Sequence, residues 1–155
     1  MDLDLELISS GDKTALLALS TLEWLATTKS VLNEMGYKVH SAGNHEDFLL
    51  RFGRVQYQIV IVEELFAAGT AEENLALKQL QQMPMVQRRN SVSILIGGYC
   101  QTLNPMQAFQ QSVHAVINPS DLPQLQPIVQ QTAANHDLFL KVYRDCELRM
   151  AQGQV

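Results

Sequence analysis

Apolar residues fall into short runs along this chain, and five of the runs have the length and composition of β-strands. Residues 15–19 form a continuous apolar run, residues 37–41 alternate between apolar and polar positions, and residues 91–96 and 113–117 repeat the strand pattern. β-Branched and apolar residues follow one another most strongly at 57–62, which is typical of a strand covered on both faces. We therefore expect 57–62 at the centre of a sheet.

The segments between these runs have helix signals. Apolar residues at three- and four-residue spacing predict a helix over 22–35, and Gly36 follows where a left-handed C-terminal cap would lie. Asn44 can cap a short second helix that ends near Gly53. Helices that alternate with strands in this way are typical of parallel sheets.

Two later helices have recognisable start signals. Thr70 with Glu73 three residues later has the form of a capping box, which predicts a helix that begins there and that Pro84 ends. Asn104 followed by Pro105 predicts the start of a short helix. Proline is tolerated at the first helical position, because the backbone N–H that it lacks would have no acceptor within the helix there.

The C-terminal part of the chain, from about residue 121 to 152, has the pattern of one long helix whose start Pro127 bends or delays. Its last part has an apolar stripe at three- and four-residue steps. The stripe consists of Phe139, Val142, Tyr143, Cys146 and Met150. Because five helices already cover both faces of the sheet, we expect the stripe to pack against a second copy or a partner. The alternative is that the helix bends back onto its own domain.

Five strands that alternate with five helices predict a doubly wound α/β domain with a five-stranded parallel sheet, a flavodoxin-like (βα)5 arrangement. We expect a polar, turn-rich N-terminal arm over residues 1–13 and one domain over 14–155 that includes the long helix. The sequence shows no internal repeat and no second domain.

Composition excludes several classes of protein. With 16 acidic residues against 11 Lys and Arg, the net charge of −5 offers no broad field for nucleic acid or anionic lipid. The N-terminus is acidic where a signal peptide is basic, and no apolar run spans a bilayer, so we expect a cytoplasmic protein without membrane contact. Cys100 and Cys146 are too far apart for a CxxC motif. We expect no metal and no cofactor.

Two short motifs resemble parts of nucleotide sites, and both are incomplete. The Lys13-Thr14 pair lacks the upstream glycine of a P-loop and precedes a strand where it should open a helix. Gly97-Gly98 ends a strand, but no helix follows it at once. The chain also has four histidines without the spacing of metal ligands: His40, His45, His114 and His136.

Three framework features together resemble the receiver domains of bacterial response regulators, over about residues 14–138. They are the Gly36-Tyr37-Lys38-Val39 sequence at the second strand, the 57–62 strand followed at once by an acid, and the Asn118-Pro119 pair after the fifth strand. The resemblance implies the receiver fold and a signalling role in a bacterial cytoplasm.

The residues that receivers use for phosphorylation are replaced at the matching positions. The family needs an acidic pair after the first strand to hold Mg²⁺, an aspartate after the third, a hydroxyl after the fourth and a lysine after the fifth. The matching positions hold, in chain order, Leu19, Ser20, Glu63, Gly97 and Asn118. The aromatic switch position of the family matches Ala115. The resemblance therefore implies a degenerate pocket without phosphoryl chemistry, and we expect no enzymatic activity.

Glu63 supports two hypotheses. In the first, its carboxylate imitates a phosphorylated aspartate by extending a negative charge toward the fourth strand. In the second, it is simply an acid retained at a solvated strand end. We favour the second, because Gly97 and Asn118 offer little for the charge to engage.

These observations predict a phosphorylation-independent pseudo-receiver that acts as a signalling and protein-interaction module. We expect an unidentified signalling protein as its partner, and a homodimer formed through the C-terminal helix. The alternative is a sensor of a small, nucleotide-type ligand in the altered strand-end pocket. A third hypothesis is an active phosphoacceptor that uses Glu63 or Glu64.

Overall fold

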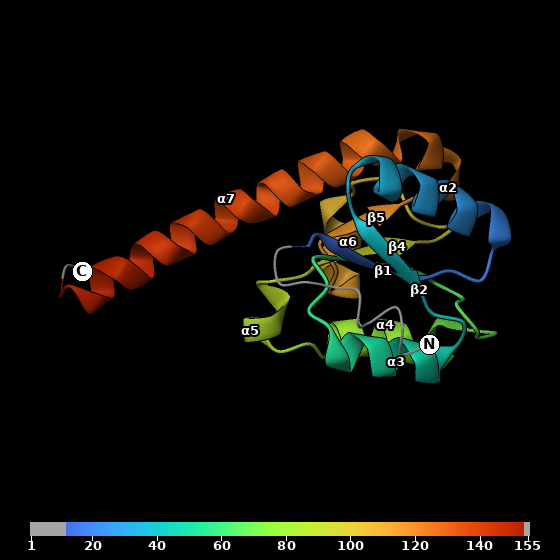
Figure 1. The fold of residues 1–155 in the computed structure, drawn as a ribbon, viewed down its shortest axis with the longest axis horizontal. Helices are drawn as coiled ribbons and strands as arrows, with labels where there is room; N and C mark the ends of the chain where they lie inside the picture. Colours follow the sequence, from blue (N-terminus) through green and yellow to red (C-terminus); the bar gives the residue numbers. More distant parts are fainter. Residues whose placement is uncertain (1–11, 154–155) are drawn as a thin grey trace.

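Five parallel strands form a single sheet in the order β2-β1-β3-β4-β5 in the computed structural model, which describes residues 12–153 (Figure 1). The strands are β1 (Thr14–Ala18), β2 (Lys38–Ser41), β3 (Ile59–Glu63), β4 (Val92–Ile96) and β5 (Ala115–Ile117). The predicted five-stranded α/β architecture is therefore confirmed, with β3 at the centre. Apart from Asp12 and Lys13, the predicted N-terminal arm lies outside the described residues.

Helices lie on both faces of the sheet (Figure 1). They are α2 (Leu22–Glu34), α3 (His45–Arg54), α4 (Leu75–Gln81), α5 (Met85–Arg88), α6 (Pro105–Gln111) and α7 (Leu125–Ala151). The described part of the chain also contains two 3-10 helices, η1 (Ala71–Glu73) and η2 (Pro119–Gln124). Apolar contacts place α3, α4 and α6 on one face, and α2, η2 and α7 on the other.

The central strands are continuous apolar runs because both of their faces are covered. Every residue of β1, β3 and β4 is buried, and along each strand the side chains alternate between the two helical layers. Leu16 of β1 and Val60 of β3 face α3 and α4, whereas Leu17 and Ile61 face α2 and α7. The edge strand β2 is partly exposed, which explains its alternating sequence.

The predicted capping box at Thr70 is wrong. Thr70 makes no side-chain capping bond, and the Glu73 carboxylate accepts a hydrogen bond from the Gly69 N–H. Asn74 is the N-cap of α4, because its Oδ1 accepts from the Leu77 N–H at 3.1 Å. Asn74 is fully buried, so its side chain also serves the packing of the preceding loop. Pro84 does not end this helix; it is the N-cap of the additional short helix α5.

The long C-terminal helix begins later than residue 121. The segment after β5 first forms η2, and α7 starts at Leu125 and runs for 27 residues. Pro127 lies in the first turn of α7, where its missing N–H would have had no helical acceptor. The prediction that Pro127 delays the helix start agrees with this boundary.

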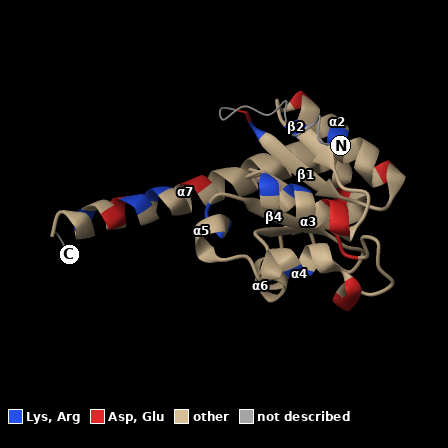
Figure 2. Ribbon diagram, turned by 60° about the horizontal axis from the view of Figure 1, so that its bottom comes forward, with Lys and Arg blue, Asp and Glu red and all other residues tan. Residues whose placement is uncertain are grey.

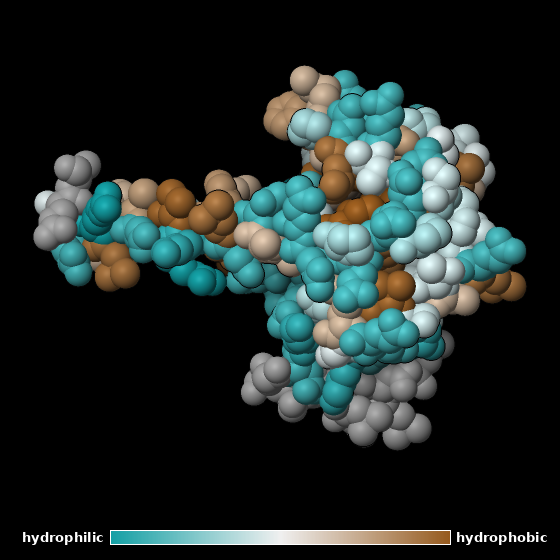
Figure 3. All heavy atoms as spheres, turned by 90° about the horizontal axis from the view of Figure 1, so that it is seen from above, coloured by the Kyte–Doolittle hydropathy of each residue, from teal (hydrophilic) through white to brown (hydrophobic). Residues whose placement is uncertain are grey.

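The C-terminal half of α7 projects beyond the rest of the molecule (Figure 1). Apolar atoms are visible along the projecting part (Figure 3), and both acidic and basic residues occur there (Figure 2). Among the described residues, α7 and the other helices are all too short or too polar to cross a lipid bilayer.

Candidate functional site

The strand-end positions that match the receiver chemistry lie together at the carboxyl edge of the sheet. Glu63 is the last residue of β3, Leu19 and Ser20 follow β1, Gly97 follows β4 and Asn118 follows β5. The register of the parallel strands places Ala18 beside Val62, and Glu63 beside Ile96. The sequence-based alignment therefore identified a set of residues from neighbouring strand ends.

The Glu63 carboxylate faces the start of α2. Its Oε1 accepts a hydrogen bond from the Thr21 N–H at 3.0 Å, and the residue is only 7% exposed. Thr21 is the N-cap of α2, where a negative charge is favourable because the first amide groups of a helix have no helical acceptors. This geometry gives the carboxylate a structural partner on the β1 side and directs it away from β4.

A second acid, Glu64, occupies the space near the fourth strand. A Cβ atom added to Gly97 would lie 2.9 Å from Glu64 Oε2, 3.2 Å from Cys100 Sγ and 3.2 Å from Tyr99 Cε1. Burial, and then the nearby Glu72, raises the pKa of Glu64. The position that holds a hydroxyl in receivers is therefore a glycine covered by the side chain of Glu64.

Tyr99 and Cys100 complete this cluster, and the sequence reasoning missed both. Burial raises the pKa of Tyr99 to about 12, with smaller contributions from Cys100 and Glu64. Burial also raises the pKa of the Cys100 thiol, so the thiol is not activated as a nucleophile. The one available signal in the sequence was the Glu63-Glu64 pair, since neighbouring residues at a strand end point to opposite sides.

Ser20 and Asn118 hold loops in place. Ser20 Oγ accepts from the Ala67 N–H at 2.9 Å, which ties the β1–α2 loop to the β3–α4 loop. Asn118 Nδ2 donates to the Cys100 carbonyl at 2.9 Å, and its Oδ1 accepts from the Ser120 N–H at 3.0 Å. Both polar side chains are thus engaged with the backbone, and neither adds a charge to the pocket.

The strand-end residues do not make a metal centre of the usual kind. Leu19 has no ligand atom in its side chain and is 4% exposed within the apolar layer under α2. Within residues 12–153, no group of three His, Cys, Asp or Glu side chains is placed to hold a metal ion. Neutralisation of a transferring phosphoryl group requires such a cation or an equivalent positive charge.

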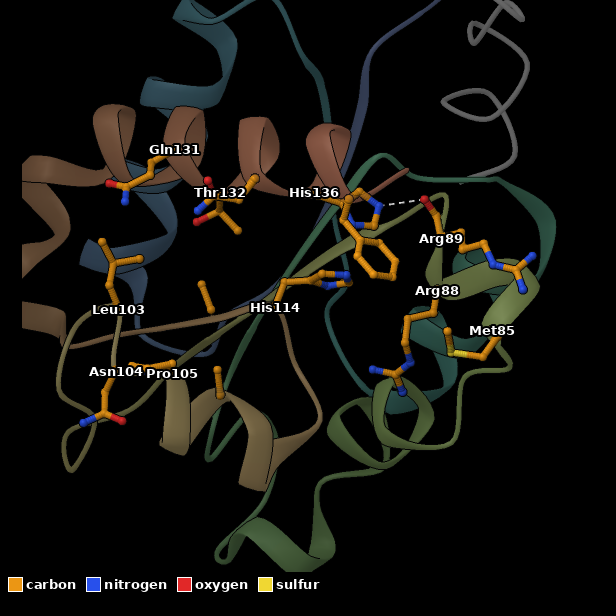
Figure 4. A pocket seen from close by; sticks show the side chains of 14 residues that line it. Met85, Arg88, Arg89, Leu103, Asn104, Pro105, His114, Gln131, Thr132 and His136 are labelled. Atoms are coloured by element: carbon orange, nitrogen blue, oxygen red, sulfur yellow. Dashed lines mark hydrogen bonds between the residues drawn. The ribbon is translucent and has the colours of Figure 1, made fainter. Parts of the chain in front are cut away.

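A separate cavity of about 470 Å³ lies between α5, α6, β5 and α7 (Figure 4). His114, which immediately precedes β5, and His136 from α7 meet at one side of it, with their ring centroids 4.6 Å apart and the rings nearly perpendicular. His114 Nδ1 accepts from the Ser93 N–H at 3.0 Å, and His136 Nε2 lies 2.6 Å from the Arg89 carbonyl. Sequence reasoning treated these two histidines as scattered, but the fold brings them together.

The electrostatic environment keeps His114 neutral. Burial, and to a smaller extent the neighbouring His136 and Arg88, lowers the pKa of His114 to about 4. Arg88 is fixed above α4 and α6, because it donates to the carbonyls of Leu80 and Ser112. The cavity therefore has a permanent positive charge near a neutral imidazole.

The predicted apolar stripe of α7 divides into two parts. Phe139 lines the cavity, and the Tyr143 ring lies 4.2 Å from the Arg89 guanidinium carbon, so both contact the domain. Val142 is 57% exposed and Met150 is 70% exposed, and Cys146 is exposed as a free thiol. Phe139 and Tyr143 contact the domain, although Phe139 is still 57% exposed, and the rest of the stripe has no cover among the described residues. The helix does not bend back onto the domain, because its C-terminal half projects away from it (Figure 1).

Comparison with known proteins identifies the architecture. No family model matches the sequence, and no curated protein matches it. Among solved structures, a CheY-like receiver domain from Methanospirillum hungatei is 16% identical with a TM-score of 0.62, and covers 82% of this chain and 98% of that chain. The receiver domain of a LuxO-type repressor from Vibrio parahaemolyticus is 14% identical with a TM-score of 0.64. This similarity covers 84% of this chain and 97% of the repressor domain.

The chain has the receiver fold. NtrX from Brucella abortus, solved in complex with ADP, is also similar, with 13% identity and a TM-score of 0.67. This similarity covers 93% of the chain but only 30% of the NtrX chain. At such low identities the comparisons establish the fold, and function must be argued from the side chains described above.

Proposed function

We propose that this protein is a phosphorylation-independent pseudo-receiver that acts as a cytoplasmic signalling and protein-interaction module. The observation that supports it best is the hydrogen bonding at the carboxyl edge of the sheet. Glu63, Ser20 and Asn118 are all engaged with loop backbone, and no second carboxylate from β1 is present to hold Mg²⁺. A receiver fold without phosphoryl chemistry retains its surfaces for binding.

Treatment with acetyl phosphate and Mg²⁺, and separately with beryllofluoride and Mg²⁺, tests this proposal. We expect no mass increase of a phosphoryl group and no change in the amide NMR spectrum. An acyl phosphate, or resonance shifts centred on Glu63 or Glu64, would favour the phosphoacceptor hypothesis and overturn the proposal. An active receiver domain treated in parallel confirms that the reagents work.

The proposed docking surface is the exposed end of the α7 stripe, and its proposed occupant is a second copy of this chain. On this exposed end Cys146 and Met150 continue the three- and four-residue steps of Phe139 and Tyr143, which gives the heptad spacing of a two-helix contact. The projecting part has three basic residues (Lys141, Arg144 and Arg149) against two acidic residues (Asp145 and Glu147), so two copies meet with little repulsion.

Light scattering over a range of protein concentrations tests self-association. Met150→Lys introduces a charge into the stripe and should shift the mass toward that of a monomer. Leu148→Lys is the matched control, because Leu148 is also an exposed apolar residue but lies on the opposite side of α7. Equal masses for the two variants, or a monomeric unmodified chain, would contradict the dimer.

The alternative function, a ligand sensor, has less support, because its ligand was expected in the strand-end pocket. Neither of the two cavities found beside α7 is lined by the strand-end residues, and Glu64 covers Gly97. Thermal-shift measurements with nucleotides test this alternative, since a ligand that binds the native state raises the melting temperature.

A further inference from the structure

The cavity between α6 and α7 has the dimensions of a small-molecule site. Its volume of about 470 Å³ lies within the range of about 300–1,000 Å³ that is typical of such sites. Gln131 and Thr132 lie on the α7 side of it, opposite Leu103 and Pro105, and His114 lies beside His136 (Figure 4). The small side chains of Ala108 and Ala115 leave the space open.

One hydrogen-bond donor in this cavity has no acceptor. The backbone N–H of Ser93 donates to His114 Nδ1, so the neutral imidazole has its proton on Nε2. Among the described residues, no oxygen or nitrogen atom accepts from His114 Nε2. Thr132, which supplies the hydroxyl group of the lining, donates to the Ile128 carbonyl instead. A ligand with an acceptor atom can therefore gain a hydrogen bond that the protein does not make for itself.

The charges around the cavity favour an anionic acceptor. Arg88 and Arg89 belong to the lining, and no Asp or Glu side chain does, although the whole chain has a net charge of −5. The Arg89 Nε–H is buried and has no hydrogen-bond partner within residues 12–153. Positive charge that is fixed beside a low-dielectric cavity stabilises an anion there more than it would in water.

The remaining surface of the cavity favours a flat apolar body. Phe139 from α7, Leu103 and Pro105 from the β4–α6 segment, and Met85 from α5 are the large apolar side chains of its lining. Aromatic rings stack on and pack against such side chains over a large area. An aromatic ligand with an acceptor group would direct the polar atoms of that group toward His114 and its ring toward Phe139.

We propose that the cavity between α5, α6, β5 and α7 binds a small aromatic carboxylate, whose carboxylate accepts a hydrogen bond from His114 Nε2–H and whose ring packs between Phe139, Leu103 and Pro105. This site is distinct from the strand-end pocket and does not depend on the proposed interaction function. Its ligand contacts both the domain and α7.

Titration of the full chain with 1-naphthoate, followed by ¹H–¹⁵N NMR of the backbone and of the histidine rings, tests the proposal. We expect saturable shifts at His114, Ala115, Thr132 and Phe139, including a downfield shift of the His114 Nε2–H. 1-Naphthamide has the same shape without the charge and should bind at least tenfold more weakly. No shift at the His114 ring, or equal binding of the two probes, would overturn the proposal.

Substitution provides a second, independent measurement. His114→Asn keeps an acceptor for the Ser93 N–H and removes the Nε2–H donor, so 1-naphthoate affinity should fall at least tenfold. His45→Asn removes an imidazole outside the cavity and should leave the affinity unchanged. Unchanged affinity in His114→Asn would contradict the assignment, and the ring spectra of the unmodified chain decide the question if that variant fails to fold.

Discussion

The Thr21 N–H donates to Glu63 Oε1 across 3.0 Å, and this bond connects the end of β3 to the start of α2. We predict that Glu63→Ala lowers the free energy of unfolding by about 1–2 kcal/mol, because the partly buried Thr21 N–H loses its acceptor. Glu63→Gln retains an acceptor oxygen and should cost less. Urea denaturation of the three proteins measures the difference, and equal stabilities of the Ala and Gln variants would count against this role.

Gly97 is required by the close approach of Glu64, Tyr99 and Cys100. We predict that Gly97→Ala destabilises the protein by about 1–3 kcal/mol through overpacking. Gly98→Ala is the matched control, since nothing lies within 4 Å of a Cβ atom at that position. Adding Glu64→Ala to Gly97→Ala should recover part of the loss. If the two single glycine variants have the same melting temperature, the close contact does not constrain this residue.

Asn74 makes three hydrogen bonds from a fully buried side chain. Its Nδ2 donates to the carbonyls of Glu63 and Glu64, each at 2.9 Å, and its Oδ1 caps α4. Asn74→Ala should cost roughly 3 kcal/mol, because α4 loses its buried cap and the carbonyls of Glu63 and Glu64 each lose a donor. Asn104→Ala removes an exposed cap from α6 and should cost only about 1 kcal/mol. Chemical denaturation compares the two, and similar losses would refute the argument from burial.

Stability should depend on pH through His114. Its pKa is about 4 in the folded protein against an ordinary value of 6.5, mainly because of burial. Between these values the unfolded chain binds more protons than the folded one, so stability decreases as the pH falls from about 6.5 toward 4. The full loss is roughly 3 kcal/mol.

Urea denaturation at several pH values between 7.5 and 4.5 measures this loss. The difference in stability between the unmodified chain and His114→Asn should shrink as the pH falls, because only the former loses the contribution of the neutral imidazole. Carboxylates that titrate in the same range affect both proteins and cancel in the difference. A constant difference across the series would show that His114 does not titrate in this way.

The sequence predicted the strands well because their burial leaves a simple pattern. Residues 15–19 and 57–62 are apolar at nearly every position, and the structure covers both faces of β1 and β3. The start of α4 was predicted wrongly because Thr70 and Glu73 have the spacing of a capping box. Asn74 supplies the cap instead, since it can also satisfy two carbonyls at the end of β3.

The candidate sites were harder to predict. The alignment found the strand-end positions, but the directions of Glu63 and Glu64 depend on where the loops after β1 and β4 place an N–H group or a glycine. His114 and His136 are far apart in the chain and belong to different elements, so only the packing of α7 against β5 brings their rings together. No local pattern encodes such a contact.

The long helix α7 has mechanical consequences for any protein that binds its projecting end. Between Ile128 and Ala151 it contains neither glycine nor proline, and its first turns are buried against the sheet. The helix is therefore rigid, and a rotation or a force applied near Met150 is transmitted to the domain. Two joined copies would hold their sheets at a defined mutual orientation, as a flexible tether could not.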